Sequence, residues 1–250
     1  MKISYFNLWV ICLFAILLSS CATREQIVYL QGEQTNMEQA LNYTPILQPD
    51  DQLVITVSAM DPKAVSPFNL INEFPGQDPT RRLTYLIDKN GEIDYPILGK
   101  IKLGGLTRIE AVEFLKGKLR EYIVDPGVNI QITNFKVTVL AEVSRPGTFT
   151  LENERVTVLE ALGLAGDLTI NGVRNNVMVV RETPENKEFF RLDLTSQEVV
   201  NSPAYYLKQN DVVYVEPNKA QISSSTYNRN IPIFISVVGL IITVISVLTR

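Results

Sequence analysis

The chain has 250 residues, of which 46% are hydrophobic and 20% are charged, the composition of an ordinary folded protein. Its formal net charge of −4 argues against a nucleic-acid partner, because binding a phosphate backbone needs a basic surface. The sequence contains no histidine, which removes the commonest general base and the commonest metal ligand.

The first twenty residues are predicted to be an export signal. Lys2 precedes a mostly apolar core, Leu8 to Leu18, that is too short for a membrane span of ~20 residues. The order Leu-Ser-Ser-Cys that ends at Cys21 resembles the lipobox of bacterial lipoproteins, which implies cleavage before Cys21 and its acylation by a fatty acid such as palmitate. The residue after the cysteine is Ala22 rather than Asp, which resembles the sorting signal for the outer membrane in Gram-negative lipoproteins. The alternative is an uncleaved anchor helix in which Cys21 is incidental.

Residues 22–45 are polar and are predicted to be a tether or a loosely packed lead-in. Strands are expected from Ile46 onwards. "QLVITVSA" and "VNIQIT" alternate apolar and polar residues, the pattern of half-buried strands. "DKNG" at 88–91 predicts a tight turn between two strands.

Two helices with the same start signal are expected. Thr107 and Glu110 form a capping box, followed by an apolar stripe of Val112, Leu115, Leu119 and Tyr122. A second Thr-x-x-Glu box begins at Thr157, and Gly166 is expected to cap that helix at its C-terminus.

A weak internal similarity suggests two related modules. "LQPDDQLVI" (47–55) and "LKQNDVVYV" (207–215) each place a polar turn, centred on Asp51 or Asp211, before an alternating strand. True repetition and convergent turn chemistry both remain open. With a boundary near Phe135, the expected fold is α+β: two small mixed-sheet modules of β-grasp type, each with a short helix.

No catalytic constellation is apparent, so we do not expect an enzyme, a cofactor or a metal. Triads that need histidine are impossible, and no Gly-rich phosphate loop occurs. "DKNGEID" at 88–94 fits an EF-hand loop poorly, because its glycine stands at the fourth position. The neighbouring acids Asp50 and Asp51 are interpreted as exposed turn carboxylates with ordinary pKa values.

Two stretches carry a family resemblance. Residues from "YTPILQPDDQLVITV" through "DPGVNIQI" are similar to the polysaccharide export domain. "VTVLAEVSRPGTFTLENERVTVLEALGLAGD" resembles a soluble-ligand-binding β-grasp (SLBB) domain. Ala141 and Asp167 depart from the family pattern, which usually has glycine at both positions.

Together these stretches resemble the outer-membrane polysaccharide export lipoproteins. The resemblance implies a ring-shaped homo-oligomer of about eight subunits, a porin-like channel that passes capsular polysaccharide or exopolysaccharide from the periplasm to the cell surface. It also implies a partner, an inner-membrane chain-length co-polymerase that is often coupled to a tyrosine kinase. The predicted segments are a signal peptide at 1–20, a lipidated tether at 21–45, the export domain at 46–134, the SLBB domain at 135–217, a linker at 218–230 and a transmembrane helix at 231–249.

The last segment contains thirteen Ile, Leu, Val or Phe residues between 231 and 249. Arg229 and Arg250 flank it as expected membrane-interface anchors. Small and weakly polar residues recur along one edge of the expected helix, at Ser236, Gly239, Thr243 and Ser246.

That edge has three interpretations: hydroxyls that bond back to their own helix, a helix–helix contact, or the wall of a water-filled lumen. The apolar tail also keeps two other functions open. One is a chain-length co-polymerase with two flanking transmembrane helices, and the other is a periplasmic glycan-binding scaffold lipoprotein.

Overall fold

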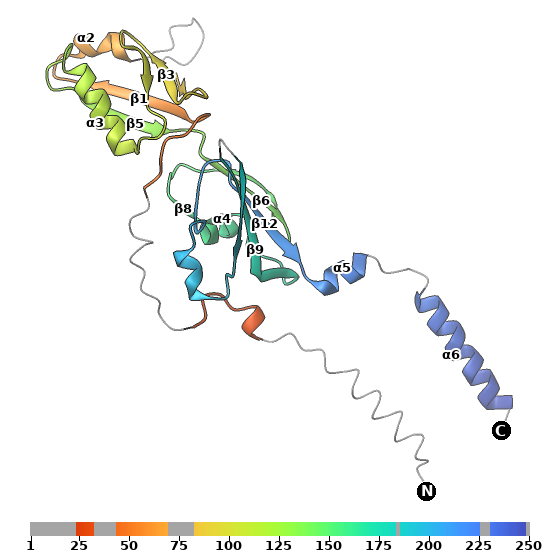
Figure 1. Ribbon diagram of the computed structural model, residues 1–250. Coiled ribbons are helices and arrows are strands. Elements are labelled where there is room, and N and C mark those ends of the chain that lie inside the picture. Colours follow the sequence, from red (N-terminus) through yellow and green to blue (C-terminus); the bar gives the residue numbers. More distant parts are fainter. Residues whose placement is uncertain (1–23, 33–43, 70–82, 184–185, 226–230, 249–250) are drawn as a thin grey trace, which may run out of the picture.

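The computed structural model describes residues 24–32, 44–69, 83–183, 186–225 and 231–248 of the chain. Within them, two modules follow one another along an elongated molecule, as Figure 1 shows. The elements are η1 (Arg24–Gln26), β1 (Gln52–Ser58), α2 (Pro62–Val65), η3 (Ser66–Phe68), β2 (Tyr85–Leu86), β3 (Glu92–Tyr95), β4 (Gly99–Lys102), α3 (Arg108–Leu119), β5 (Gly127–Ile132), β6 (Lys136–Ala141), β7 (Gly147–Thr150), β8 (Val156–Thr157), α4 (Val158–Leu164), β9 (Gly172–Glu182), β10 (Lys187–Leu192), η4 (Gln197–Asn201), β11 (Tyr206–Leu207), β12 (Val212–Pro217), α5 (Lys219–Ser225) and α6 (Ile231–Leu248).

The first module is built on an antiparallel sheet with the order β2-β1-β5, beside a separate β3–β4 hairpin. The alternation predicted for β1 is confirmed, since Leu53, Ile55 and Val57 are buried and their neighbours are not. Helix α3 lies against β5, as Figure 1 shows. The mixed sheet expected in this module was wrong, because the pairings between its described strands are all antiparallel.

The capping box predicted for α3 is present, with Thr107 and Glu110 each bonding the other's backbone N–H. The predicted stripe was displaced by a fraction of a turn. Ala111, Leu115 and Leu119 are buried, whereas Tyr122 lies beyond the helix and is exposed. Because the helix ends at Leu119, Tyr122 no longer follows its apolar face.

The second module holds a mixed sheet with the order β10-β9-β12-β6-β7, in which only the β12–β6 pairing is parallel. The capping box at Thr157 begins α4, as predicted. At the other end, Gly166 takes a φ of 76° and its N–H bonds Gly163 O, while Asp167 N bonds Leu162 O. These two bonds form a Schellman motif, so the expected glycine cap is confirmed.

The turn predicted at 88–91 forms, with Asp88 Oδ1 accepting from the N–H groups of Asn90 and Glu92. The two strands on either side of the turn, β2 and β3, have other partners, however. β2 pairs with β1, and β3 pairs with β4. The turn therefore connects two sheets rather than closing a simple hairpin.

The positions where the sequence departs from the family's glycines have left-handed backbone. Ala141 has a φ of 72° and Asp167 a φ of 68°. This conformation costs a residue with a Cβ roughly 1–2 kcal/mol that glycine does not incur. At Asp167 the side chain offsets part of that cost, because it accepts bonds from Tyr29 Oη and from Leu168 N.

The lead-in segment packs more closely than expected over its described part. Leu30 N donates to Leu194 O at 3.0 Å, and Gln31 N donates to Thr195 O at 2.5 Å. At the other terminus, residues 219–225 of the expected linker form the helix α5.

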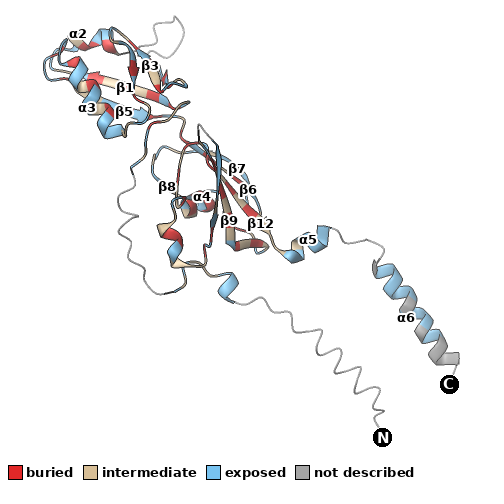
Figure 2. Cartoon of the chain, in the orientation of Figure 1, coloured by how far each residue is buried: buried red, intermediate tan, exposed pale blue. Residues whose placement is uncertain are grey.

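Helix α6 occupies the segment for which a transmembrane helix was predicted, and its described side chains are exposed (Figure 2). Within the part of the chain that is described, no helix is both long and apolar enough to cross a membrane. The prediction of a transmembrane helix therefore has no support from the structure.

Candidate functional site

Two turns of the same geometry precede the middle strands of the two sheets, β1 and β12. Gln48 N donates to Asp51 Oδ2 at 2.8 Å, and Lys208 N donates to Asp211 Oδ2 at 2.8 Å. The residue before each aspartate is left-handed, with φ values of 70° and 65°. The sequence similarity between these segments thus corresponds to a shared local structure.

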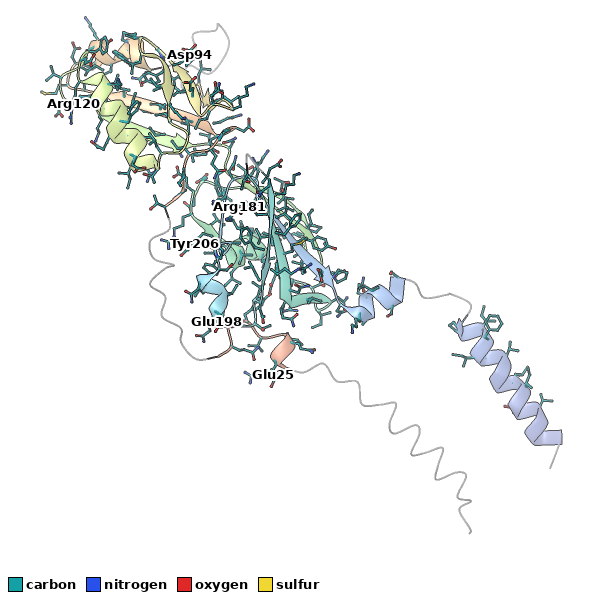
Figure 3. The ribbon with its side chains drawn as sticks, viewed as in Figure 1. Glu25, Asp94, Arg120, Arg181, Glu198 and Tyr206 are labelled. Carbon is teal, nitrogen blue, oxygen red and sulfur yellow. The ribbon has the colours of Figure 1, made fainter. Side chains whose placement is uncertain are left out.

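The aspartate of the second turn has a buried counterion. Arg181, on β9, binds both carboxylate oxygens of Asp211, with Nη2 at 2.7 Å from Oδ2 and Nε at 3.1 Å from Oδ1. The same guanidinium donates to the carbonyls of Pro203 and Tyr206. Both ions are buried, so this pair fixes the turn to the sheet, in the part of the second module that faces the first (Figure 3).

The aspartate of the first turn has no such partner. Asp51 is 1% exposed, and its Oδ1 has no hydrogen-bond partner among the described residues. Burial raises the pKa of the Asp51 carboxyl to about 6, against the opposing hydrogen bond from Gln48 N, and the charges of Glu154 and Asp50 raise it further. The interpretation of Asp51 as an exposed, ordinary carboxylate was wrong, because the turn points this side chain inward.

Asn134, in the linker between the modules, forms hydrogen bonds with residues of both modules. Its Oδ1 accepts from Gln52 N and its Nδ2 donates to Asp50 O, both at 2.8 Å, which ties it to the first module. Gln209 of the second module donates to Asn134 O and accepts from Lys136 N. Three hydrogen bonds to Asn134, and a fourth from Lys136 N to the same Gln209 side chain, fix the joint between the two modules.

A polar groove of about 470 Å³ crosses this joint, lined by Pro45, Arg108, Asn129, Ile130, Gln131, Glu152, Asn153, Glu154 and Arg155. Arg108 at the start of α3 forms an ion pair with Glu154 of the second module, with Nε 3.3 Å from Oε2. An adjoining cavity of about 360 Å³ is lined by Asp51 and Lys208 among others. Amides and paired charges of this kind can hydrogen-bond a hydroxyl-rich ligand.

Two neighbouring tyrosines, Tyr205 and Tyr206, lie close to Arg155 of this groove. Tyr205 is partly buried against the core, and its ring contacts that of Tyr206 edge-on at 5.3 Å. The guanidinium of Arg155 lies 4.6 Å from the centre of the Tyr206 ring. Both rings thus have packing roles.

The structure does not bring the predicted site residues together. Cys21, Arg229 and Arg250 lie outside the described residues. Ser236, Gly239 and Thr243 are exposed on α6, and Ser246 belongs to the same helix.

Two hydroxyls of that helix edge, those of Ser236 and Thr243, bond within the helix, in line with the first of the three interpretations. Ser236 Oγ donates to Pro232 O at 2.8 Å, and Thr243 Oγ1 donates to Gly239 O at 2.9 Å. A back-bonded hydroxyl can still accept a hydrogen bond, so a role in a contact or a lumen stays a prediction.

Two family models match most of this chain between them. The model of polysaccharide biosynthesis/export proteins matches residues 39–133, and the SLBB domain model matches residues 135–215. The chain belongs to this polysaccharide export family, as its motifs predicted.

Two curated relatives carry similar sequences. The EPS I polysaccharide export outer membrane protein EpsA of Ralstonia solanacearum is 24% identical over 139 residues, 54% of this chain and 36% of the relative. The protein of the same name from Ralstonia nicotianae is 26% identical over 136 residues, 53% of this chain and 35% of the relative. The chain thus spans about a third of the length of the curated relatives it matches.

Proposed function

We propose that this protein is the outer-membrane component of a polysaccharide export system, which passes capsular polysaccharide or exopolysaccharide from the periplasm to the cell surface. The observation that carries the proposal is the tandem match of the export and SLBB family models over residues 39–133 and 135–215. The names of both relatives, polysaccharide export outer membrane proteins, agree with it. The protein binds and conducts its substrate and makes or breaks no bond.

The proposed arrangement assigns each segment a task. A signal at 1–20 is removed, and acylated Cys21 begins a tether at 21–45 in the membrane. The export domain at 46–134 and the SLBB domain at 135–217 lie in the periplasm, and 218–230 joins them to the helix at 231–249. The clamped joint at Asn134 supports this order, because it holds both domains as one unit along the export path.

Export requires an enclosed path, so the proposal includes a closed ring of about eight copies. The described side chains of α6 are exposed and mostly apolar in the single chain, and apolar helices of this kind are usually covered in an assembly. We assign the edge of Ser236, Gly239, Thr243 and Ser246 to helix neighbours or to the lumen, and Arg229 and Arg250 to the membrane interface. An inner-membrane chain-length co-polymerase, often coupled to a tyrosine kinase, is the proposed docking partner.

Deletion of the gene in its own bacterium tests this function. We expect the polysaccharide to disappear from the cell surface and accumulate in the periplasm, and the intact gene to restore export. Continued export of chains of altered length would instead identify a chain-length co-polymerase. Unchanged export with unchanged chain length would leave only a scaffold role and contradict the proposal.

A further inference from the structure

A cavity of about 670 Å³ lies at the end of the second module that is remote from the first. Its lining comes from the lead-in segment, the start of β9, and the end of β12 with α5: Gln26, Ile27, Ile170, Asn171, Gly172, Val173, Arg174, Asn175, Glu216, Pro217, Asn218, Lys219 and Ile222. Figure 3 shows Glu25, next to this lining, at the far end of the molecule from Asp94 and Arg120. The joint described above takes no part in it.

The cavity contains a buried cation, Arg174, for which the described part of the chain supplies no anionic partner. Arg174 is 7% exposed, and its Nε–H has no acceptor among the described residues. Its Nη1 donates to the carbonyls of Thr169 and Gly172, and its guanidinium lies 5.5 Å from the centre of the Tyr29 ring. None of the ion pairs formed within the described ranges includes Arg174.

A buried guanidinium with an unused N–H costs free energy that an oxyanion would offset. The other charges of the lining favour the same ligand. Glu216 is already bound by Arg191 and Asn176, and Lys219 adds a second positive charge. The site therefore suits a phosphate or carboxylate rather than a cation.

The lining also includes apolar side chains that are exposed. Ile27, Ile170 and Ile222 come from three separate segments, and Ile170 is 71% exposed. An oxyanion acceptor beside exposed isoleucines matches a lipid, which has an anionic head group and acyl chains. A free anion would use the arginine and leave the isoleucines in water.

Both terminal parts of the chain leave the module beside this cavity. Gln26 lies five residues after Cys21, the proposed site of acylation, and α5 leads toward α6. Figure 1 shows η1 and α5 at the same end of the second module. With Cys21 acylated, as proposed above, the cavity would lie within a few residues of the membrane surface.

We propose that this cavity binds the phosphate head group of an acidic phospholipid, with Arg174 and Lys219 contacting the phosphate and the three isoleucines contacting the acyl chains. The site would orient the module on the membrane independently of the polysaccharide path.

A tryptophan reporter in the full-length processed protein tests this site. Ile170→Trp places a fluorophore at the cavity, and Phe189→Trp places a control on β10. Phe189 pairs with Val180, roughly 26 Å along β9 from Gly172 at ~3.3 Å per residue. In vesicles that contain brominated phosphatidylglycerol, we expect strong quenching at position 170 and little at position 189.

The head-group preference is measured by replacing phosphatidylglycerol with brominated phosphatidylcholine in the Ile170→Trp background. Arg174→Gln should lower the apparent affinity for phosphatidylglycerol roughly tenfold, the loss expected for one charged hydrogen bond. Lys219→Gln, at a more exposed site, should weaken it less, and Arg120→Gln in the first module should leave it unchanged. Circular dichroism of each variant checks that the fold is intact.

Three results would overturn the proposal. One is equal quenching at positions 170 and 189. Another is equal quenching by the two lipids in the Ile170→Trp protein without a further substitution. The third is emission at position 170 that depends on protein concentration but not on lipid, which would make the cavity a contact between copies. None of these measurements involves the polysaccharide. If the lipid site is refuted, the export proposal is therefore still tested separately, by measuring polysaccharide export.

Discussion

The matched aspartates of the two modules give opposite predictions for the same substitution. Asp51 and Asp211 occupy equivalent turns, but only Asp211 has a buried cation beside it. Asp211→Asn removes one partner of a buried pair and leaves Arg181 uncompensated, which costs about 3–5 kcal/mol. Asp51→Asn removes a buried charge that has no cationic partner among the described residues and only the Gln48 N–H as a donor, so it should stabilise the protein.

The size of the Asp51 effect follows from its pKa. The pKa of this carboxyl is about 6 in the folded protein and near its ordinary value of 3.8 in the unfolded chain. The folded state therefore holds the proton more tightly, and stability falls as the pH rises from about 4 to about 6. A difference of about two pKa units corresponds to about 3 kcal/mol, which Asp51→Asn should recover above pH 6 and not below pH 4.

Urea unfolding of the full-length processed protein in mild detergent, followed by circular dichroism, measures both effects. At pH 7.5 we expect a higher midpoint for Asp51→Asn and a lower one for Asp211→Asn. At pH 4 the gain from Asp51→Asn should vanish. Equal losses of stability for the two variants at pH 7.5 would refute the reasoning, since the orphan carboxylate would then be stabilising its turn.

Three further predictions concern single positions. Ala141→Gly should raise the melting temperature by relieving about 1 kcal/mol of left-handed strain, and a lower value would show that the alanine fits its turn without strain. Arg108→Gln should cost no more than about 1 kcal/mol in urea unfolding, because its ion pair with Glu154 is half exposed, and a larger loss would mean that the joint depends on it. Cys21→Ser should abolish processing and fatty-acid labelling in cells, and normal processing of the variant would rule out the lipoprotein.

Local signals predicted the regular elements well. Both Thr-x-x-Glu boxes begin helices, and the alternation of Leu53, Ile55 and Val57 gives the buried face of β1. These signals succeed because a cap or an alternating face depends on residues a few positions apart. The stripe on α3 was placed less well, since the helix ends at Leu119 and Tyr122 lies beyond it.

The ionic features were missed because they depend on distant pairings. Arg181 follows Val177 and Val179 in the alternation of β9, which was a usable sign that its side chain points inward. Nothing local shows that Asp211 receives it while Asp51 receives no cation, since that outcome depends on the neighbours of each turn in three dimensions. The same holds for Asn134, whose three hydrogen bonds join residues more than seventy positions apart.

The central claim, that this protein carries polysaccharide across the outer membrane, is tested most directly by locating the polymer in cells that lack it. We predict that labelled polysaccharide is found in the periplasm of the deletion strain and returns to the surface when the intact gene is supplied. Polysaccharide that reaches the surface of the deletion strain in normal amount and length would contradict the account.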